Sequence, residues 1–305
     1  MKILMPIDGS IFSKSALVFI ASRATLIKRQ PEVELLNVQY PVSARVARAA
    51  GKDLVRAHHE SESNAVIKPA VAALKRAGLK AQATALVGIP GDEVRRVAAA
   101  GAADLIIMGS HGHTGLKSLL FGSLTQTVLA SCTTPLLVLR SDAVPKKDSL
   151  KVGIAIDGSK YSLAVVRYLL KHHSLFGETP AFTLIHVVPD LLALVMPGFI
   201  GGESVRGIDP EQVAEMRRAA VERAISPARK LLKAAGFEIA EAQLVDNNPG
   251  DAIAAFATKN KLDVLAMGPH GEGKFRSAMV GSVATRVAAK CRTALLFIRE
   301  KQSSK

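Results

Sequence analysis

Short aliphatic runs alternate along the chain with longer segments whose apolar residues recur at helical spacing. In the first half we expect strands at residues 2–7, 32–38, 80–87, 105–108 and 136–140, and helices that include 65–76 and 93–100. The strand candidates are continuously apolar, which is typical of parallel strands covered by helices on both faces. The pattern predicts an α/β fold, a doubly wound and mostly parallel sheet of five strands with right-handed crossovers.

The second half of the chain repeats the first. Ile-Asp-Gly-Ser at 7–10 returns at 156–159, and Pro-Gly-Asp at 90–92 returns at 249–251, so the offset grows from 149 to 159 residues. We expect most of the ten added residues in the segment 189–210, as a mobile connection. Solenoid units are only about 20 to 50 residues long, so a repeat of this length indicates a duplicated domain. We therefore expect tandem domains at 1–143 and 149–300, each with its own five-stranded sheet.

Composition narrows the class of protein. The 305 residues are 49% hydrophobic and 22% charged, which excludes a disordered chain. Only 4% are aromatic and Trp is absent, which argues against stacking platforms for sugars or nucleobases. The net charge of +14 favours anionic ligands. Nucleic-acid binding is the weaker interpretation of this charge, because the sequence contains no recognisable nucleic-acid module.

Cysteine usage and the longest apolar stretch indicate a compartment. Cys132 and Cys291 are too few for a disulfide framework, and we expect both to be small buried hydrophobic residues. The N-terminal apolar run is stopped by Asp8 before it reaches the length of a signal peptide. The stretch 191–202 is interrupted by Pro197 and falls short of the ~20 residues that span a bilayer. We expect a cytoplasmic protein that does not associate with membranes.

A stretch with regularly spaced glycines follows the fourth predicted strand of each half. The spacing is the same in both: Gly109, Gly112, Gly122 and Ser123 in the first half, and Gly268, Gly271, Gly281 and Ser282 in the second. Glycine lets a ligand approach the backbone, and the start of the following helix, with Ser123 at or near its cap, offers N–H groups to an anion. The pattern predicts a phosphate site beyond the carboxyl ends of the strands; a tight loop without ligand is the alternative.

The spacing G-x2-G-x9-G-[ST] resembles the signature of the nucleotide-binding branch of the universal stress protein family, and the likeness extends over nearly the whole chain. The resemblance implies ATP as ligand, with or without Mg²⁺. It assigns Asp8 and Val38 to the nucleoside end and Gly109, Gly112, Gly122 and Ser123 to the phosphates. In the second half it assigns Asp157 and Val187 to the nucleoside end. The residues that it assigns to the phosphates there are Gly268, Gly271, Gly281 and Ser282. Pro269 and Lys274 stand there in place of Ser110 and Gly115, which leaves open whether the second site is occupied.

The resemblance also implies a function and an assembly. It implies a tandem, cytoplasmic, ATP-binding stress-response and signalling module without strong catalytic activity; slow ATP hydrolysis or phosphotransfer at the same sites is the alternative. Single domains of the family pair through their last strands, so residues 136–140 and 295–299 are expected to meet as an intrachain pseudo-dimer. A homodimer and a protein partner stay open.

Other interpretations of these residues are structural. Asp8 and Asp157 could cap the following helices, Val38 and Val187 could be core residues, and His111 and His270 are best explained by loop packing rather than metal binding. A P-loop ATPase is rejected because Phe275 occupies the place of the hydroxyl that binds Mg²⁺. Ser10 and Ser159 lie outside the elbow motif of serine hydrolases.

Overall fold

The computed structural model describes residues 1–27, 30–111, 121–140, 144–190, 210–269 and 280–299. The strands of the first half are β1 (Lys2–Pro6), β2 (Glu32–Gln39), β3 (Ala81–Val87), β4 (Leu105–Gly109) and β5 (Leu136–Leu139). Those of the second half are β6 (Lys151–Ala155), β7 (Ala181–Val188), β8 (Ile239–Val245), β9 (Val264–Met267) and β10 (Ala294–Phe297). All five predicted strands of the first half are present, and each has a counterpart in the second. The segment predicted to hold the added residues lies largely outside the described part of the chain.

The helices of the two halves also correspond. The first half contains α1 (Ile11–Ser22), α2 (Ala44–Ala50), α3 (Lys52–Arg76), α4 (Pro90–Ala100) and α5 (Ser123–Ser131). The second contains α6 (Lys160–Lys171), a 3₁₀ turn η1 (His173–Phe176), α8 (Pro210–Ala234), α9 (Pro249–Lys259) and α10 (Ser282–Lys290). Proline begins α4 and α9, where its missing N–H costs nothing, and the left-handed residues Gly78 and Gly236 follow the long helices α3 and α8.

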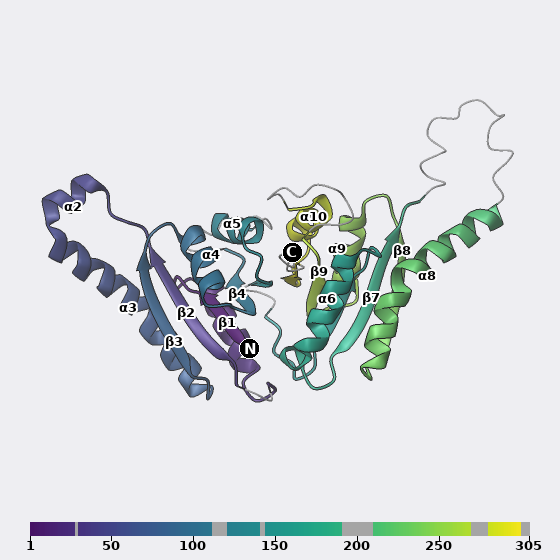
Figure 1. Ribbon diagram of the computed structural model, residues 1–305, viewed down its shortest axis with the longest axis horizontal. Coiled ribbons are helices and arrows are strands. Elements are labelled where there is room, and N and C mark those ends of the chain that lie inside the picture. Colours follow the sequence, from purple (N-terminus) through teal and green to yellow (C-terminus); the bar gives the residue numbers. More distant parts are fainter. Residues whose placement is uncertain (28–29, 112–120, 141–143, 191–209, 270–279, 300–305) are drawn as a thin grey trace, which may run out of the picture.

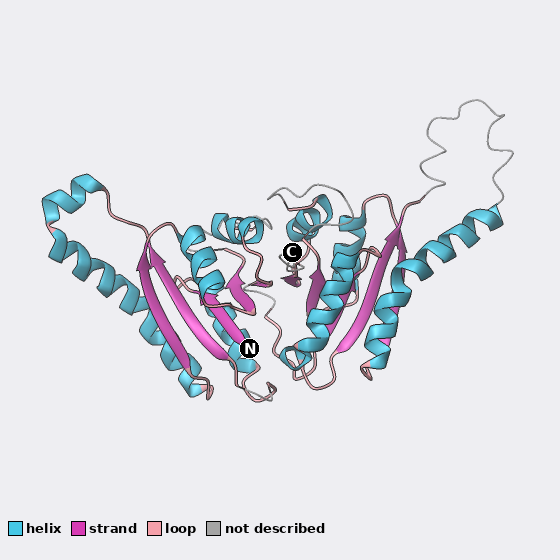
Figure 2. Ribbon diagram, viewed as in Figure 1, coloured by secondary structure: helices cyan, strands magenta, loops and turns pink. Residues whose placement is uncertain are grey.

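The two halves share one sheet of ten strands in the order β3-β2-β1-β4-β5-β10-β9-β6-β7-β8 (Figures 1 and 2). Within each half neighbouring strands are parallel, whereas β5 and β10 pair antiparallel, with Leu137 opposite Leu296. The expected meeting of the last strands is confirmed. The five strands predicted for each half are present, and this pairing joins the two sets into one continuous sheet.

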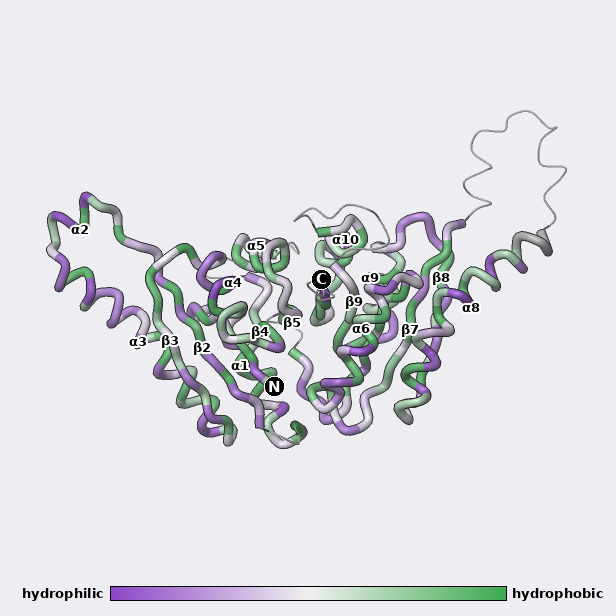
Figure 3. Tube along the Cα trace, viewed as in Figure 1, coloured by the Kyte–Doolittle hydropathy of each residue, from purple (hydrophilic) through white to green (hydrophobic). Residues whose placement is uncertain are grey.

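Two hydrophobic layers cover the sheet. Alternate strand residues such as Ile3 and Leu4 point to opposite faces; α1, α3, α6 and α8 pack on one face, and α4, α5, α9 and α10 on the other. Each layer contains residues of both halves, so the core continues across the junction. Hydrophobic residues concentrate along the strands, whereas the outlying parts of α2 and α3 are largely hydrophilic (Figure 3).

Both cysteines lie inside this core, as predicted. Cys132 is 5% exposed and Cys291 is fully buried. Burial raises the pKa of the Cys132 thiol, which keeps it in the protonated and less reactive form.

The outermost strands depart from the prediction that both faces are covered. In β3 the side chains of Gln82, Ala83, Ala85 and Val87 are exposed, and β8 has the same burial pattern. These strands lie at the ends of the sheet, where their chief covering is one long helix, α3 or α8. Because Gln82 and Ala83 are consecutive and point to opposite faces, β3 is only partly covered on both faces, although its sequence is largely apolar.

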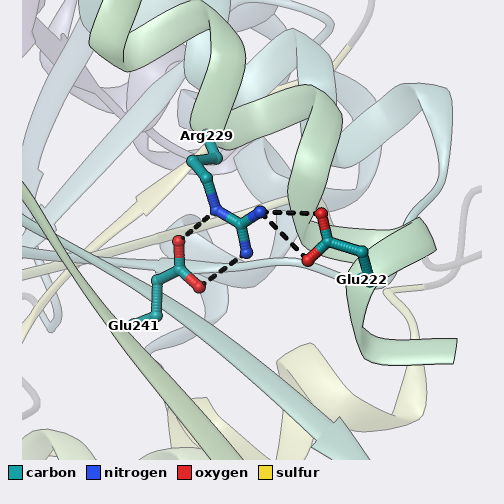
Figure 4. Close-up of polar contacts among 3 residues, drawn as sticks. All are labelled: Glu222, Arg229 and Glu241. Carbon is teal, nitrogen blue, oxygen red and sulfur yellow. Dashed lines mark hydrogen bonds and ion pairs between the residues drawn. The ribbon is translucent and has the colours of Figure 1, made fainter. Parts of the chain in front are cut away.

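An arginine fastens α8 to its edge strand. The Arg229 guanidinium makes a bidentate pair with Glu241 of β8, at 2.6 and 2.9 Å, and contacts both carboxylate oxygens of Glu222 at 2.8 and 3.0 Å (Figure 4). The hydrogen bonds from Arg229 hold the pKa values of both glutamates below their ordinary range.

None of the described helices combines the length and the apolar character that crossing a membrane requires.

Candidate functional site

Two pockets lie at equivalent places in the two halves, beyond the carboxyl ends of the central strands. The first, of about 400 Å³, is lined by Asp8, Val38, Gly109, Gly122 and Ser123. The second, of about 490 Å³, is lined by Asp157, Val187, Gly268, Gly281 and Ser282. The structure thus brings together every predicted site residue that it describes; Gly112 and Gly271 lie outside the described residues. Both volumes suit a small organic ligand.

The aspartate after the first strand of each half closes a turn. One carboxylate oxygen of Asp8 accepts the N–H of Ser10 at 3.0 Å, and Asp157 accepts the N–H and hydroxyl of Ser159 at 3.0 and 2.6 Å. The helix caps are these serines, whose hydroxyls accept the N–H groups of Ser13 and Ser162, each at 3.2 Å. The interpretation of the aspartates as helix caps is therefore wrong, and both carboxylates line a pocket.

The helix that follows the glycine stretch starts in the same way in both halves. Gly122 and Gly281 are the N-caps of α5 and α10, and their N–H groups donate to the carbonyls of Ser110 and Pro269 at 2.8 Å. Ser123 and Ser282 are consequently the first helical residues, directly after the cap, in agreement with the position at or near the cap that was expected for Ser123. No side chain of the described residues caps either helix start, and neither first turn contains an acidic residue. Each pocket is therefore bordered by a helix start that suits an anion.

Gly109 has a packing role that the spacing of the glycines did not reveal. A Cβ atom at this position would lie 2.5 Å from the backbone carbonyl carbon and oxygen of Phe12. α1 crosses the end of β4 so closely that only glycine fits between them. The glycine that the signature assigns to phosphate binding also sets the distance between α1 and the sheet.

Polar residues on the second strand of each half were missed. Asn37 donates to the Ile7 carbonyl at 2.8 Å and accepts from Gln39 at 2.9 Å. Its counterpart His186 has Nδ1 at 2.6 Å from the Ile156 carbonyl, so this nitrogen carries the proton and donates. Both side chains line their pockets. The available signal was a polar residue at the same place in two matching apolar stretches, residues 35–38 and 184–187.

Histidine and acidic residues do not converge as metal ligands in the described ranges. His111 Nδ1 lies 3.0 Å from Ser110 Oγ, and its ring centre is 5.2 Å from that of Phe12. These contacts support the loop-packing interpretation; His270 is outside the described residues. No group of three His, Cys, Asp or Glu residues that could hold a metal ion forms within the part of the chain that is described. Glu62 of α3 adds a second carboxylate to the first pocket.

Comparison with known proteins agrees with this architecture of two α/β halves on one sheet. The profile of the universal stress protein family matches residues 1–140 and 150–299. The chain is 25% identical over 319 residues to the universal stress protein Slr1230 of Synechocystis, covering 97% of this chain and 99% of that protein. It is 42% identical over 67 residues to the universal stress protein MJ0577 of Methanocaldococcus jannaschii, covering 22% and 41% of the two chains.

A solved structure shows the same arrangement along the whole chain. The crystal structure of a universal stress protein from Archaeoglobus fulgidus aligns with a TM-score of 0.70 at 20% identity and covers 98% of both chains. Fold and repeat define a tandem α/β protein. The chain belongs to the universal stress protein family and carries two copies of the family's domain.

Proposed function

We propose that this universal stress protein is a cytoplasmic ATP-binding module of stress response and signalling, with domains at 1–143 and 149–300. One observation carries the proposal. In each half a strand-end carboxylate, a glycine at or just beyond the end of the fourth strand and an uncapped helix start border a single pocket. This combination suits a ligand with hydroxyl groups at one end and phosphates at the other.

The chemistry assigns each part of the ligand to a part of the pocket. A ribose hydroxyl is a good donor to the Asp8 or Asp157 carboxylate, and the base would lie against Val38 or Val187. Phosphate oxygens would accept the first N–H groups of α5 or α10, where the helix dipole favours negative charge. The proposal assigns Gly112 and Gly271 to the phosphates as well.

Titration calorimetry with ATP tests the proposal. Wild type should bind two equivalents, whereas Gly122→Glu and Gly281→Glu should each bind one, because a carboxylate at a helix start repels phosphate. Both glycines have ordinary negative φ values of −62°, so the backbone tolerates a side chain. Ala99→Glu adds the same charge at the exposed far end of α4 and should leave two sites. The proposal fails if wild type releases no heat at millimolar ATP, or if both glycine variants keep two sites.

A slow ATPase at the same sites is the second candidate, and the pair of carboxylates in the first pocket favours it. Asp8 and Glu62 both line that pocket, and phosphoryl transfer needs a positioned metal and an attacking water. Phosphate release that disappears in both Asp8→Ala and Glu62→Ala would support catalysis. Release no faster than that of a denatured sample would remove this candidate.

A further inference from the structure

The helices that border the two pockets, α5 and α10, are each held by an arginine from the other half. Arg299 follows β10, and its Nη2 donates to the carbonyls of Leu129 and Ala130 in the last turn of α5, at 2.6 and 3.2 Å. Arg140 follows β5, and its Nη2 donates to the Ala288 carbonyl of α10 at 2.6 Å. The antiparallel pairing of β5 with β10 brings both arginines to the opposite half. Figure 1 shows α5 and α10 on either side of this junction.

These contacts complete the ends of the helices. The last four carbonyls of a helix have no partner within it. In α5 the N–H of Cys132 donates to the Val128 carbonyl at 2.9 Å, and Arg299 donates to the carbonyls of the next two residues, Leu129 and Ala130. A cation at this end also complements the helix dipole, which is the same dipole that favours an anion at the start of the helix. Arg299 therefore acts on α5 at the end opposite to Gly122.

The first pocket is also contacted from the other half near the start of its helix. Phe121, directly before Gly122, packs edge-on against Phe297 of β10 with ring centres 6.1 Å apart. The Arg140 guanidinium carbon lies 5.3 Å from the centre of the Phe121 ring. The corresponding residues of the repeat are Val280 and Val138, which cannot make these aromatic contacts. α5 is thus contacted by the second half near both of its ends.

Burial makes these arginines dependent on their acceptors. The Arg140 side chain is almost fully buried, and burial lowers the pKa of the Arg299 guanidinium. A buried guanidinium needs acceptors in fixed positions, and the carbonyls of the opposite helix supply them.

We propose that Arg299 and Arg140 are positioning residues. Arg299 holds α5 in place beside the first pocket, and Arg140 holds α10 in place beside the second. As far as ligand affinity is concerned, this inference rests on the ATP-binding function proposed above. Removing Arg299 should loosen α5 and weaken phosphate binding in the first pocket while sparing the second.

Hydrogen exchange of the ligand-free protein tests the positioning itself. Arg299→Met keeps most of the apolar stem but removes the donors, and amides of α5 should exchange about tenfold faster, with α10 unchanged. Arg299→Lys keeps the charge without the planar fork and should restore part of the protection. Arg56→Met, at an exposed arginine paired with Asp53 on α3, is the matched control and should change neither helix. Unchanged exchange in α5 of Arg299→Met would overturn the inference.

Affinity measurements locate the effect in one pocket. In a Gly281→Glu background, which leaves the first pocket, Arg299→Met should raise the Kd for ATP about threefold to tenfold, and Arg299→Lys should recover part of the loss. In a Gly122→Glu background the same change should leave the Kd within twofold. Equal effects in both backgrounds, or none in either, would overturn the inference. Absence of ATP binding in both backgrounds and in wild type would refute the proposed function, and hydrogen exchange would still decide the role of Arg299.

Discussion

Gly109→Ala would place a methyl group where α1 crosses the end of β4. The new Cβ would lie 2.5 Å from the carbonyl carbon, the carbonyl oxygen and the Cβ of Phe12, whereas ordinary contacts begin at 3.4 Å. The obstacle includes backbone, which cannot rotate aside as a side-chain end can. α1 and β4 must therefore separate by roughly 0.9 Å, the difference between these two distances.

The cost follows from what α1 buries. Phe19 and Ile20 of this helix are completely buried, so the displacement disturbs the core as overpacking does, at about 1–3 kcal/mol. Alanine also restricts the unfolded chain, which offsets about 0.4–1 kcal/mol. The midpoints of these two ranges give an expected net loss of about 1.3 kcal/mol in the free energy of unfolding. Because α1 starts beside Asp8, ATP binding in the first pocket should weaken as well.

Urea unfolding followed by circular dichroism measures this loss. Gly88→Ala is the matched control: its Cβ would lie 2.9 Å from Cγ of Glu93, a flexible side chain that can move away. The control should stay within about 0.5 kcal/mol of wild type. If Gly109→Ala unfolds at the same urea concentration as Gly88→Ala, then the close approach of α1 does not explain this glycine.

Two further perturbations concern charge. Burial lowers the pKa of His172 in the folded protein below the ordinary histidine value of about 6.5. At pH values just below 6.5 the unfolded chain therefore binds more protons at this residue than the folded protein does. The free energy of unfolding should fall as the pH drops below about 6.5, and it should level off below the folded pKa. His172→Gln should flatten the dependence of the urea midpoint between about pH 5 and 7.5, and an unchanged slope would exclude His172 as its source. Arg229→Met should lower the free energy of unfolding by about 1 kcal/mol near pH 7, because it breaks the bidentate pair with Glu241. The hydrogen bonds from Arg229 lower the pKa of the Glu241 carboxyl, so the contribution of the pair to the free energy of unfolding disappears as Glu241 is protonated in acid. Arg218→Met, at an exposed position of the same helix, is the control and should lower the free energy of unfolding less at every pH.

The features that the sequence predicts well depend on local patterns that are repeated. Each central strand is a continuous apolar run, and the second copy of Ile-Asp-Gly-Ser shows where the next domain begins. The predicted end of the first strand is within one residue of the observed one, and the glycine spacing leads to both pockets because strand ends meet at one edge of a parallel sheet. The ligand roles of the site residues stay predictions.

The features that the sequence does not predict depend on neighbours that are distant along the chain. An apolar run does not reveal that β3 lies at the end of the sheet, since exposure depends on the strand order. The sequence suggests Asp8 as a possible helix cap, whereas the geometry of the turn makes Ser10 the cap. The contact of Arg299 with Leu129 joins residues 170 positions apart, and no local pattern announces it.

Because β5 and β10 pair directly, the segment between the domains is not needed to hold the two halves together. A cut near residues 144–149 would leave two fragments, each ending its sheet in a leucine-rich strand with unpaired backbone groups. Such fragments should find each other again from solution and restore the joined sheet. The segment between the domains then acts only by raising the effective concentration of one half around the other. The pairing of β5 with β10 provides the binding energy between the halves.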